Sequence, residues 1–444
     1  MRSGQRWITA GLCCLPLLIG SPLPILAEDR AKSFAQDLAA AKRAGIPTTP
    51  QELQLPLPPP DQNAAPLYTE LTKILEAKPL SKDEKIIEYS GYRGVLSPEQ
   101  FERLRRALKS RSDVVSLVHQ AVARPKCIFV RNWKVPVDVF VPEYARMRSA
   151  ARFLIAESLL MTHNGKPLEA VRNQAPGFHI ARHATKEHQF IGYLVGNAID
   201  GMTLTGFQKI LYLSHGDPKV AEEVRAAVEK GLESHSLRKA LEFQAGCDTV
   251  TLEYMRRKGP KTMADVYTGK VDASLQMTPR DWSTFIDANS GLLLKNMRRL
   301  IAVAETPYPV ASRTFRAVQT EYGRDQDRRH LLALTFVPIY LDSDEKRASI
   351  QAQEEVTRAG AFALAWKAKH GAFPEKLDGA SSPKFVDPFD GKPLRYRREG
   401  AGFVVYSVGA TGKFTGGAPD QKADKETRFR YPAPAEFTEP LREE

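Results

Sequence analysis

Residues 344–374 read DEKRASIQAQEEVTRAGAFALAWKAKHGAFP, and they divide the chain into two parts. Apolar residues recur every three or four positions from Ile350 to Trp366, which predicts one long amphipathic helix. Gly371 ends this pattern and Pro374 follows it, as is typical of a helix C-terminus. Gly360 lies inside the pattern and weakens the helix by about 1 kcal/mol relative to alanine, unless close packing requires a bare backbone there.

The residues after this helix carry turn and hairpin signals. Residues 386–393 read VDPFDGKP, in which Asp387 and Asp390 are placed to accept turn hydrogen bonds. Residues 394–398 and 403–407 flank the sequence EGAG, which predicts a short β-hairpin. We therefore expect a small α+β module over residues 343–444, made of a long helix and a β-hairpin.

This order of elements resembles the C-terminal part of the major pseudopilin (protein G) of type II secretion systems. Its motifs are Gly-x-aromatic-Pro at 371–374, Asp-Pro-aromatic-x-Gly-x-Pro at 387–393, Tyr-Ser-x-Gly-Ala-x-Gly at 406–412 and Gly-Gly at 416–417. A pseudopilin also begins with a long apolar assembly helix, and residues 201–205 match its start only superficially. The resemblance therefore implies a shared module and not a polymerising subunit.

The same resemblance implies a calcium site in the last loop. Many pseudopilins bind calcium there through carbonyl and carboxylate oxygens, the ligands that this hard cation prefers. Thr411 stands where the family has an aspartate, and the remaining candidate ligands are Asp420, Asp424 and the carbonyl of Ser407. A loop that needs no metal is the alternative.

Residues 66–340 carry the signals of a helical body. The sequence SPEQ at 97–100 is a capping box with proline at the first helical position, and DP at 217–218 and TP at 278–279 repeat this capped opening. A helix over 147–161, a turn at 163–166 and a second helix from Pro167 resemble a tetratricopeptide-type hairpin, but that repeat does not recur along the chain. The expected fold class is mainly α, with a helical-hairpin body and the small C-terminal α+β module.

The N-terminus predicts export. Arg2 and Arg6 precede an apolar stretch over residues 7–27, and EDR follows at 28–30, which is typical of a signal peptide cleaved after Ala27. Three prolines within the stretch argue against a spanning helix. Residues 28–65 then predict a short helix and a proline-rich linker, LPLPPP at 55–60. We expect a periplasmic or extracellular protein without stable membrane insertion.

The distribution of charge bears on nucleic-acid binding, and the cysteine content bears on disulfide formation. The net charge is +12, but the basic residues are dispersed and not interleaved with stacking aromatics, so we expect no nucleic-acid partner. Only Cys127 and Cys247 remain once the predicted signal peptide is removed. An oxidising compartment would allow them to form a disulfide, and two buried free thiols are the alternative.

Catalytic motifs are scarce. There is no nucleophile elbow, Walker A loop or dinucleotide fingerprint. His179 and His183 are four residues apart and could share a transition metal with a distant ligand, whereas solvated or capping histidines are the alternative. We expect a non-enzymatic envelope protein that binds an envelope or secretion-related protein and has no cofactor other than calcium. The alternative is a secreted metal-dependent hydrolase that uses residues 179–188.

Overall fold

A computed structural model describes residues 27–444, except 92–93, 135, 137–138, 140, 232, 234, 264–276, 326, 378–383, 413–426, 435–436 and 442–444. The predicted signal peptide lies outside the described residues, apart from Ala27, which begins the first helix. Asp420 and Asp424 also lie outside them. Within the described ranges, no helix is long and apolar enough to cross a membrane.

Helices dominate the described part of the chain, as the sequence predicts. The helices are α1 (Ala27–Arg43), α2 (Pro50–Leu53), α3 (Ala65–Ala77), α4 (Ile86–Tyr89), α5 (Pro98–Ser110), α6 (Ser112–Val122), α7 (Glu143–His163), α8 (Pro167–Gln174), α9 (Gly177–Thr185), α10 (Phe190–Leu213), α11 (Pro218–Gly231), α12 (Leu237–Lys258), η2 (Pro260–Thr262), α14 (Pro279–Val303), α15 (Tyr308–Arg324), η3 (Arg328–His330), α16 (Leu331–Phe336), η4 (Val337–Tyr340) and α17 (Ser343–His370). The strands are β1 (Arg395–Glu399), β2 (Gly402–Tyr406) and β3 (Arg428–Tyr431).

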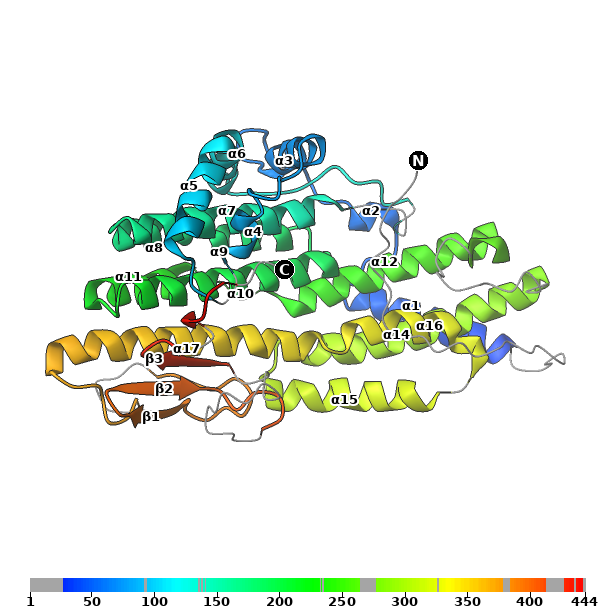
Figure 1. Ribbon diagram of the computed structural model, residues 1–444. Helices are drawn as coiled ribbons and strands as arrows, with labels where there is room; N and C mark the ends of the chain where they lie inside the picture. The colour runs from blue at the N-terminus through cyan, green and yellow to red at the C-terminus, as the bar shows by residue number, and fades with distance from the viewer. Residues whose placement is uncertain are drawn as a thin grey trace.

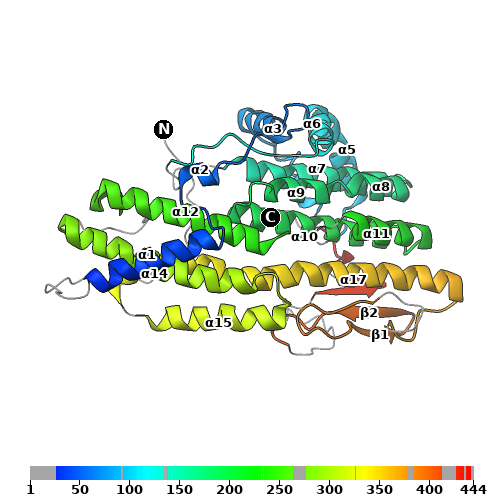
Figure 2. The ribbon, with the colours of Figure 1, turned by 180° about the vertical axis from the view of Figure 1, so that it is seen from behind.

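The long helices lie in stacked layers (Figure 1, and Figure 2 from behind). α3 to α6 cover α7, α8 and α9, and the next layer contains α10, α11 and α12. α17 packs on α10 and α11 with one side and on β2 and β3 with the other. α17 therefore lies between the helical body and the sheet.

The capped helix starts are confirmed. Ser97 and Gln100 form a reciprocal capping box at α5, and Thr278 accepts a hydrogen bond from the backbone of Asp281 at α14. The Asp217 carboxylate caps α11 in the same way. These side chains satisfy backbone N–H groups that have no partner inside the helix. α7 and α8 form the expected hairpin around a short turn.

The C-terminal module contains the predicted long helix and hairpin. β1 and β2 are antiparallel, with Arg395 opposite Tyr406, and Gly371 ends α17 in the left-handed conformation at φ +78°. A third strand, β3, pairs with β2 and was not predicted. A Cβ atom at Gly360 would overlap the ring of Phe429 in β3, so glycine is required for the strand to lie directly on α17. The close packing that would justify this glycine is therefore present.

The apolar core is continuous across the predicted boundary between body and module. One buried cluster includes Phe207 of α10 and Val224 of α11 together with Val356 of α17 and Phe403 of β2. The boundary between residues 340 and 343 falls where η4 ends and α17 begins. Independent folding of residues 343–444 stays a prediction, and the shared core favours folding together with the body.

Candidate functional site

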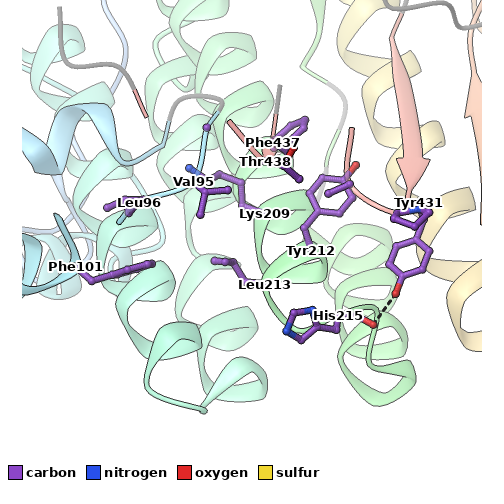
Figure 3. A pocket seen from close by; sticks show the side chains of 13 residues that line it. Val95, Leu96, Phe101, Lys209, Tyr212, Leu213, His215, Tyr431, Phe437 and Thr438 are labelled. Atoms are coloured by element: carbon purple, nitrogen blue, oxygen red, sulfur yellow. Dashed lines mark hydrogen bonds between the residues drawn. The ribbon is translucent and has the colours of Figure 1, made fainter. Parts of the chain in front are cut away.

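A cavity of about 400 Å³ lies where three distant parts of the chain meet (Figure 3). We call Tyr431, the last residue of β3, together with the described residues that follow it, 432–434 and 437–441, the C-terminal strap. The cavity is bounded by this strap, by residues 94–101 and by the C-terminal end of α10. The lining residues are Gly94, Val95, Leu96, Phe101, Lys209, Tyr212, Leu213, His215, Tyr431, Pro432, Ala433, Phe437 and Thr438.

Backbone pairing holds one end of the strap against the helical body. The Val95 N–H donates to the Glu439 carbonyl at 2.8 Å, and the Leu441 N–H donates to the Val95 carbonyl at 3.0 Å. Gly94 has φ +112°, and a Cβ atom there would lie 2.9 Å from the Leu441 Cα. Glycine is therefore needed both for this backbone conformation and for the close approach of the strap.

Aromatic contacts hold the other end of the strap. The Tyr431 hydroxyl donates to the His215 carbonyl at 2.8 Å, as Figure 3 shows. The Tyr212 ring lies against Phe429 and Phe437, with ring centroids 5.3 and 4.9 Å away. The strap thus connects the sheet to the end of α10 and then to residues 94–96, and it covers the space between them.

Lys209 is the one lysine among the described residues of the cavity wall. Its side chain comes from α10 and is only 4% exposed, and its Nζ donates to the Ser90 carbonyl at 2.6 Å. Burial lowers the pKa of this amine to about 7, because an apolar environment disfavours the ammonium form. Lys209 therefore changes its charge near neutral pH.

The cavity wall is mainly apolar. Apart from Lys209, His215 and Thr438, the described lining residues are glycine, aliphatic or aromatic residues. The wall therefore suits an apolar ligand.

His183, one of the two candidate metal ligands, is already engaged through both ring nitrogens. Its Nε2 donates to the Arg124 carbonyl at 2.8 Å, so its Nδ1 accepts from the Tyr68 hydroxyl at 3.0 Å. Burial lowers the pKa of His183 to about 3, and the neighbouring His179 contributes to the same direction. The ring is neutral, and neither nitrogen points a lone pair toward a metal.

His179 lies beside His183 on α9, with ring centroids 4.5 Å apart. Glu187 is not on this helix, because α9 ends at Thr185. Glu187 pairs instead with Arg131, whose Nη2 lies 3.0 Å from its Oε2. The described residues contain no group of three or more His, Cys, Asp or Glu side chains that could hold a metal ion.

Ser407 is the only candidate calcium ligand among the described residues, and its hydroxyl has a structural role. It donates to Oδ1 of Asp387 at 2.8 Å, and Asp387 also accepts from the N–H groups of Phe389 and Val408. Asp390 accepts from the N–H of Lys392. The turn-capping role predicted for both aspartates is thus confirmed, while calcium binding stays a prediction.

Cys127 and Cys247 are both buried free thiols, so the candidate disulfide is not formed in this structure. They belong to different hydrophobic clusters, Cys127 with α3 to α7 and Cys247 with Trp133 and Phe243. Burial raises the pKa of each thiol. The two side chains behave as small core residues.

The sequence interpretation missed Lys209, although one signal could have identified it. Residues 190–213 are apolar on all sides of the helix and contain only two charged residues, Asp200 and Lys209. A helix with no polar face is buried, so its charged residues must be buried too. Asp200 has a polar neighbour, because its Oδ2 lies 2.8 Å from Nε2 of His235. Lys209 faces a cavity.

Comparison of the chain with family models, with curated proteins and with solved structures found no match.

Proposed function

We propose that this protein is an exported, non-enzymatic binding protein of the cell envelope, and that the cavity under the C-terminal strap is its binding site. The observation that carries this proposal is the cavity itself, about 400 Å³ and bounded mainly by apolar side chains from three parts of the chain. The signal-like N-terminus supports export.

The lining favours binding over catalysis. Ligand sites are mostly apolar, with a few polar groups that orient the ligand. Here the Tyr431 hydroxyl is engaged with the His215 carbonyl, and the Lys209 amine contacts the Ser90 carbonyl. These two hydrogen bonds connect the segments that form the wall. The apolar side chains of the wall supply the contact area for a ligand.

A neutral fluorescent dye tests the site. N-phenylnaphthylamine emits strongly only after it leaves water, so we expect saturable fluorescence with the wild-type protein. Val95→Trp would fill the cavity, whereas Val310→Trp places the same change on α15, at a residue that is 51% exposed. We expect Val95→Trp to abolish the saturable signal and Val310→Trp to retain it.

Two results would overturn the proposal: no saturable binding by the wild type, or equal binding by Val95→Trp. A thermal melt of each variant establishes that the chain is folded. If Val95→Trp fails to fold, Leu213→Trp fills the same cavity from α10 and replaces it.

A second candidate function is binding of a secretion or surface-assembly protein through the C-terminal module. The long helix α17 followed by an antiparallel hairpin supports it, because the resemblance to the pseudopilin module rests on that order. Arg398 lies exposed on β1, at the edge of the sheet. An exposed edge strand is a common surface for pairing with another chain.

A crosslinking pull-down with the whole chain from envelope extract tests this second candidate. We expect a specific partner whose recovery falls in Arg398→Glu and is unchanged in Arg105→Glu, a matched charge reversal on α5. Recovery of nothing by the wild type, or equal recovery by both variants, would remove the sheet edge as a docking surface.

A further inference from the structure

We infer that residues 55–60, LPLPPP, form an exposed polyproline II segment that binds a partner protein through an aromatic-lined groove of that partner. The segment connects α2 with α3 (Figure 1) and lies outside both the cavity wall and the C-terminal module. The inference therefore does not rest on the proposed function. It follows from the restricted backbone of the segment, its pattern of exposure, its fixed ends and the apolar side chains on its surface.

The proline content restricts the backbone of the segment. Proline fixes φ at about −65°, and a residue that precedes a proline favours an extended conformation. Residues 55–59 belong to no helix or strand, and within the described part of the chain the N–H groups of Leu55 and Leu57 donate to no backbone carbonyl. These properties are those of a polyproline II helix, which has no internal hydrogen bonds.

Exposure along the segment repeats every three residues. Leu55 and Pro58 are half-buried, whereas the two residues that follow each of them are exposed. A polyproline II helix has about three residues per turn, so one of its edges lies on the protein and two edges face solvent. Pro56 and Pro59 share an exposed edge, which is the spacing of a PxxP recognition motif.

Both ends of the segment are fixed to the body. Leu53, just before it, is fully buried in a hydrophobic cluster. At the other end, Nη1 of Arg124 donates to the Pro60 carbonyl at 2.7 Å, and the Lys126 N–H donates to the Gln62 carbonyl at 3.0 Å. A segment that is already held in its binding conformation loses little further entropy on association.

The surface around the segment carries exposed apolar side chains. Among the described residues, Val130 and Leu57 are the most exposed large apolar side chains, at 81% and 53%. Leu55 and Ile128, close to them in the chain, line the same small pocket, so the two extended segments lie side by side. Grouped apolar side chains on a surface are typical of a protein-binding site.

The chemistry of the exposed edges identifies the kind of partner. Prolines have no N–H to donate, so the segment is a poor strand to add to the edge of a partner's sheet. Proline-rich segments in the polyproline II conformation bind instead in aromatic-lined grooves, as they do in SH3 and WW domains. We therefore expect a partner domain with such a groove.

Photocrosslinking with the whole chain tests the inference. The exposed Asp61, directly after the segment, is replaced by p-benzoylphenylalanine, and the protein is irradiated in a cell extract that contains both envelope and soluble fractions. We expect a crosslink that maps to an aromatic-lined groove of one protein. An excess of the peptide QLPLPPPDQ, residues 54–62, should suppress this crosslink roughly tenfold. The same peptide with alanine in place of Pro56 and Pro59 should not suppress it.

Matched substitutions provide a second measurement. Leu57→Asp places a charge on an exposed edge of the segment, and Val310→Asp makes the same kind of change on α15, at a residue that is 51% exposed. We expect Leu57→Asp to lower the yield of the crosslink roughly tenfold, because it removes an anchoring side chain, and Val310→Asp to leave the yield unchanged. Thermal melts establish that both variants are folded, and Pro56→Ala replaces Leu57→Asp if that variant fails to fold.

The contrary outcomes are specific. No crosslinked protein, or a crosslink that the peptide of residues 54–62 does not suppress, would overturn the inference. A crosslink to a second copy of this chain would overturn it too, because the surface would then be an interface between copies. Equal yields from Leu57→Asp and Val310→Asp, or a crosslink to a partner surface without an aromatic groove, would have the same consequence.

Discussion

Arg131 and Lys209 are both buried basic residues, yet their surroundings differ. The side chain of Arg131 is 5% exposed, and Lys209 as a whole residue is 4% exposed. Arg131 lies 3.0 Å from Glu187 and 3.3 Å from Glu143, and its guanidinium stacks over the Phe129 ring. Lys209 contacts a backbone carbonyl and lines an apolar cavity. Two carboxylates face the Arg131 guanidinium, whereas a backbone carbonyl accepts from the Lys209 amine.

The physical reason is the cost of removing a charge from water. Opposite charges in good geometry offset that cost, so both partners stay ionised, and removal of one leaves the other unpaired. A buried lysine that donates to a neutral carbonyl offsets the cost by releasing its proton, and burial accordingly lowers the pKa of Lys209. The same substitution of the cation by methionine should therefore have opposite effects on stability at the two positions.

The largest expected effect is at the paired cation. Arg131→Met leaves the Glu187 carboxylate buried without its counter-charge, in a place where burial already raises its pKa. We expect the free energy of unfolding to fall by about 3–5 kcal/mol. Urea denaturation measures it, and Arg105→Met, which removes a surface pair with Glu102, should cost less than about 1 kcal/mol. Similar losses in both variants would contradict the structural role of the buried pair.

The next effect has the opposite sign. Lys209→Met removes an amine whose proton the folded state releases at about pH 7, while the unfolded chain keeps it until about pH 10.4. After the lost hydrogen bond to Ser90 is taken into account, we expect the variant to be more stable than the wild type at pH 7 by about 1–3 kcal/mol.

This difference should depend on pH in a defined window. Between about pH 7 and about pH 10.4 the unfolded wild type binds one more proton at this site than the folded one, so wild-type stability rises with pH. The advantage of Lys209→Met should therefore shrink across that window and be constant below about pH 7. Denaturation midpoints of both proteins along a pH series measure this, and an advantage that stays constant across the window would show that the amine stays protonated in the fold.

The sequence predicts an interaction well when the interacting residues are neighbours in the chain, and poorly when they are far apart. Capping boxes such as Ser97 with Gln100 and the hairpin turn at 399–402 involve neighbours in the chain, so both were predicted correctly. Arg131 pairs with a residue 56 positions away, and the cavity joins residues more than 300 positions apart. No periodic pattern in the sequence indicates contacts between residues so far apart. β3 was missed for the same reason, because a four-residue strand becomes recognisable only when it pairs with β2.

A destabilising effect of similar size is expected at the strap. Gly94→Ala forces a side chain into a backbone with φ +112° and against the Leu441 backbone, at a cost of about 1–3 kcal/mol. The strap should separate locally, and hydrogen exchange at the amides of Val95 and Leu441 should accelerate. Gly45→Ala is the control, because it has φ +79° but nothing near its Cβ position. Equal exchange in the two variants would mean that the strap pairing does not depend on this glycine.

At His183, one of the two histidines that the sequence offered as candidate metal ligands, we expect no effect of metal. Metal binding requires a lone pair on a ring nitrogen, and the Arg124 carbonyl and the Tyr68 hydroxyl occupy both nitrogens. A metal would have to break two buried hydrogen bonds, so zinc or EDTA should leave the melting temperature unchanged. A rise with zinc that His183→Gln removes would contradict this and restore the hydrolase interpretation. His183 thus resembles Arg131, because the partners of both side chains lie within the protein. A ring whose two nitrogens are both engaged has no lone pair left for a metal.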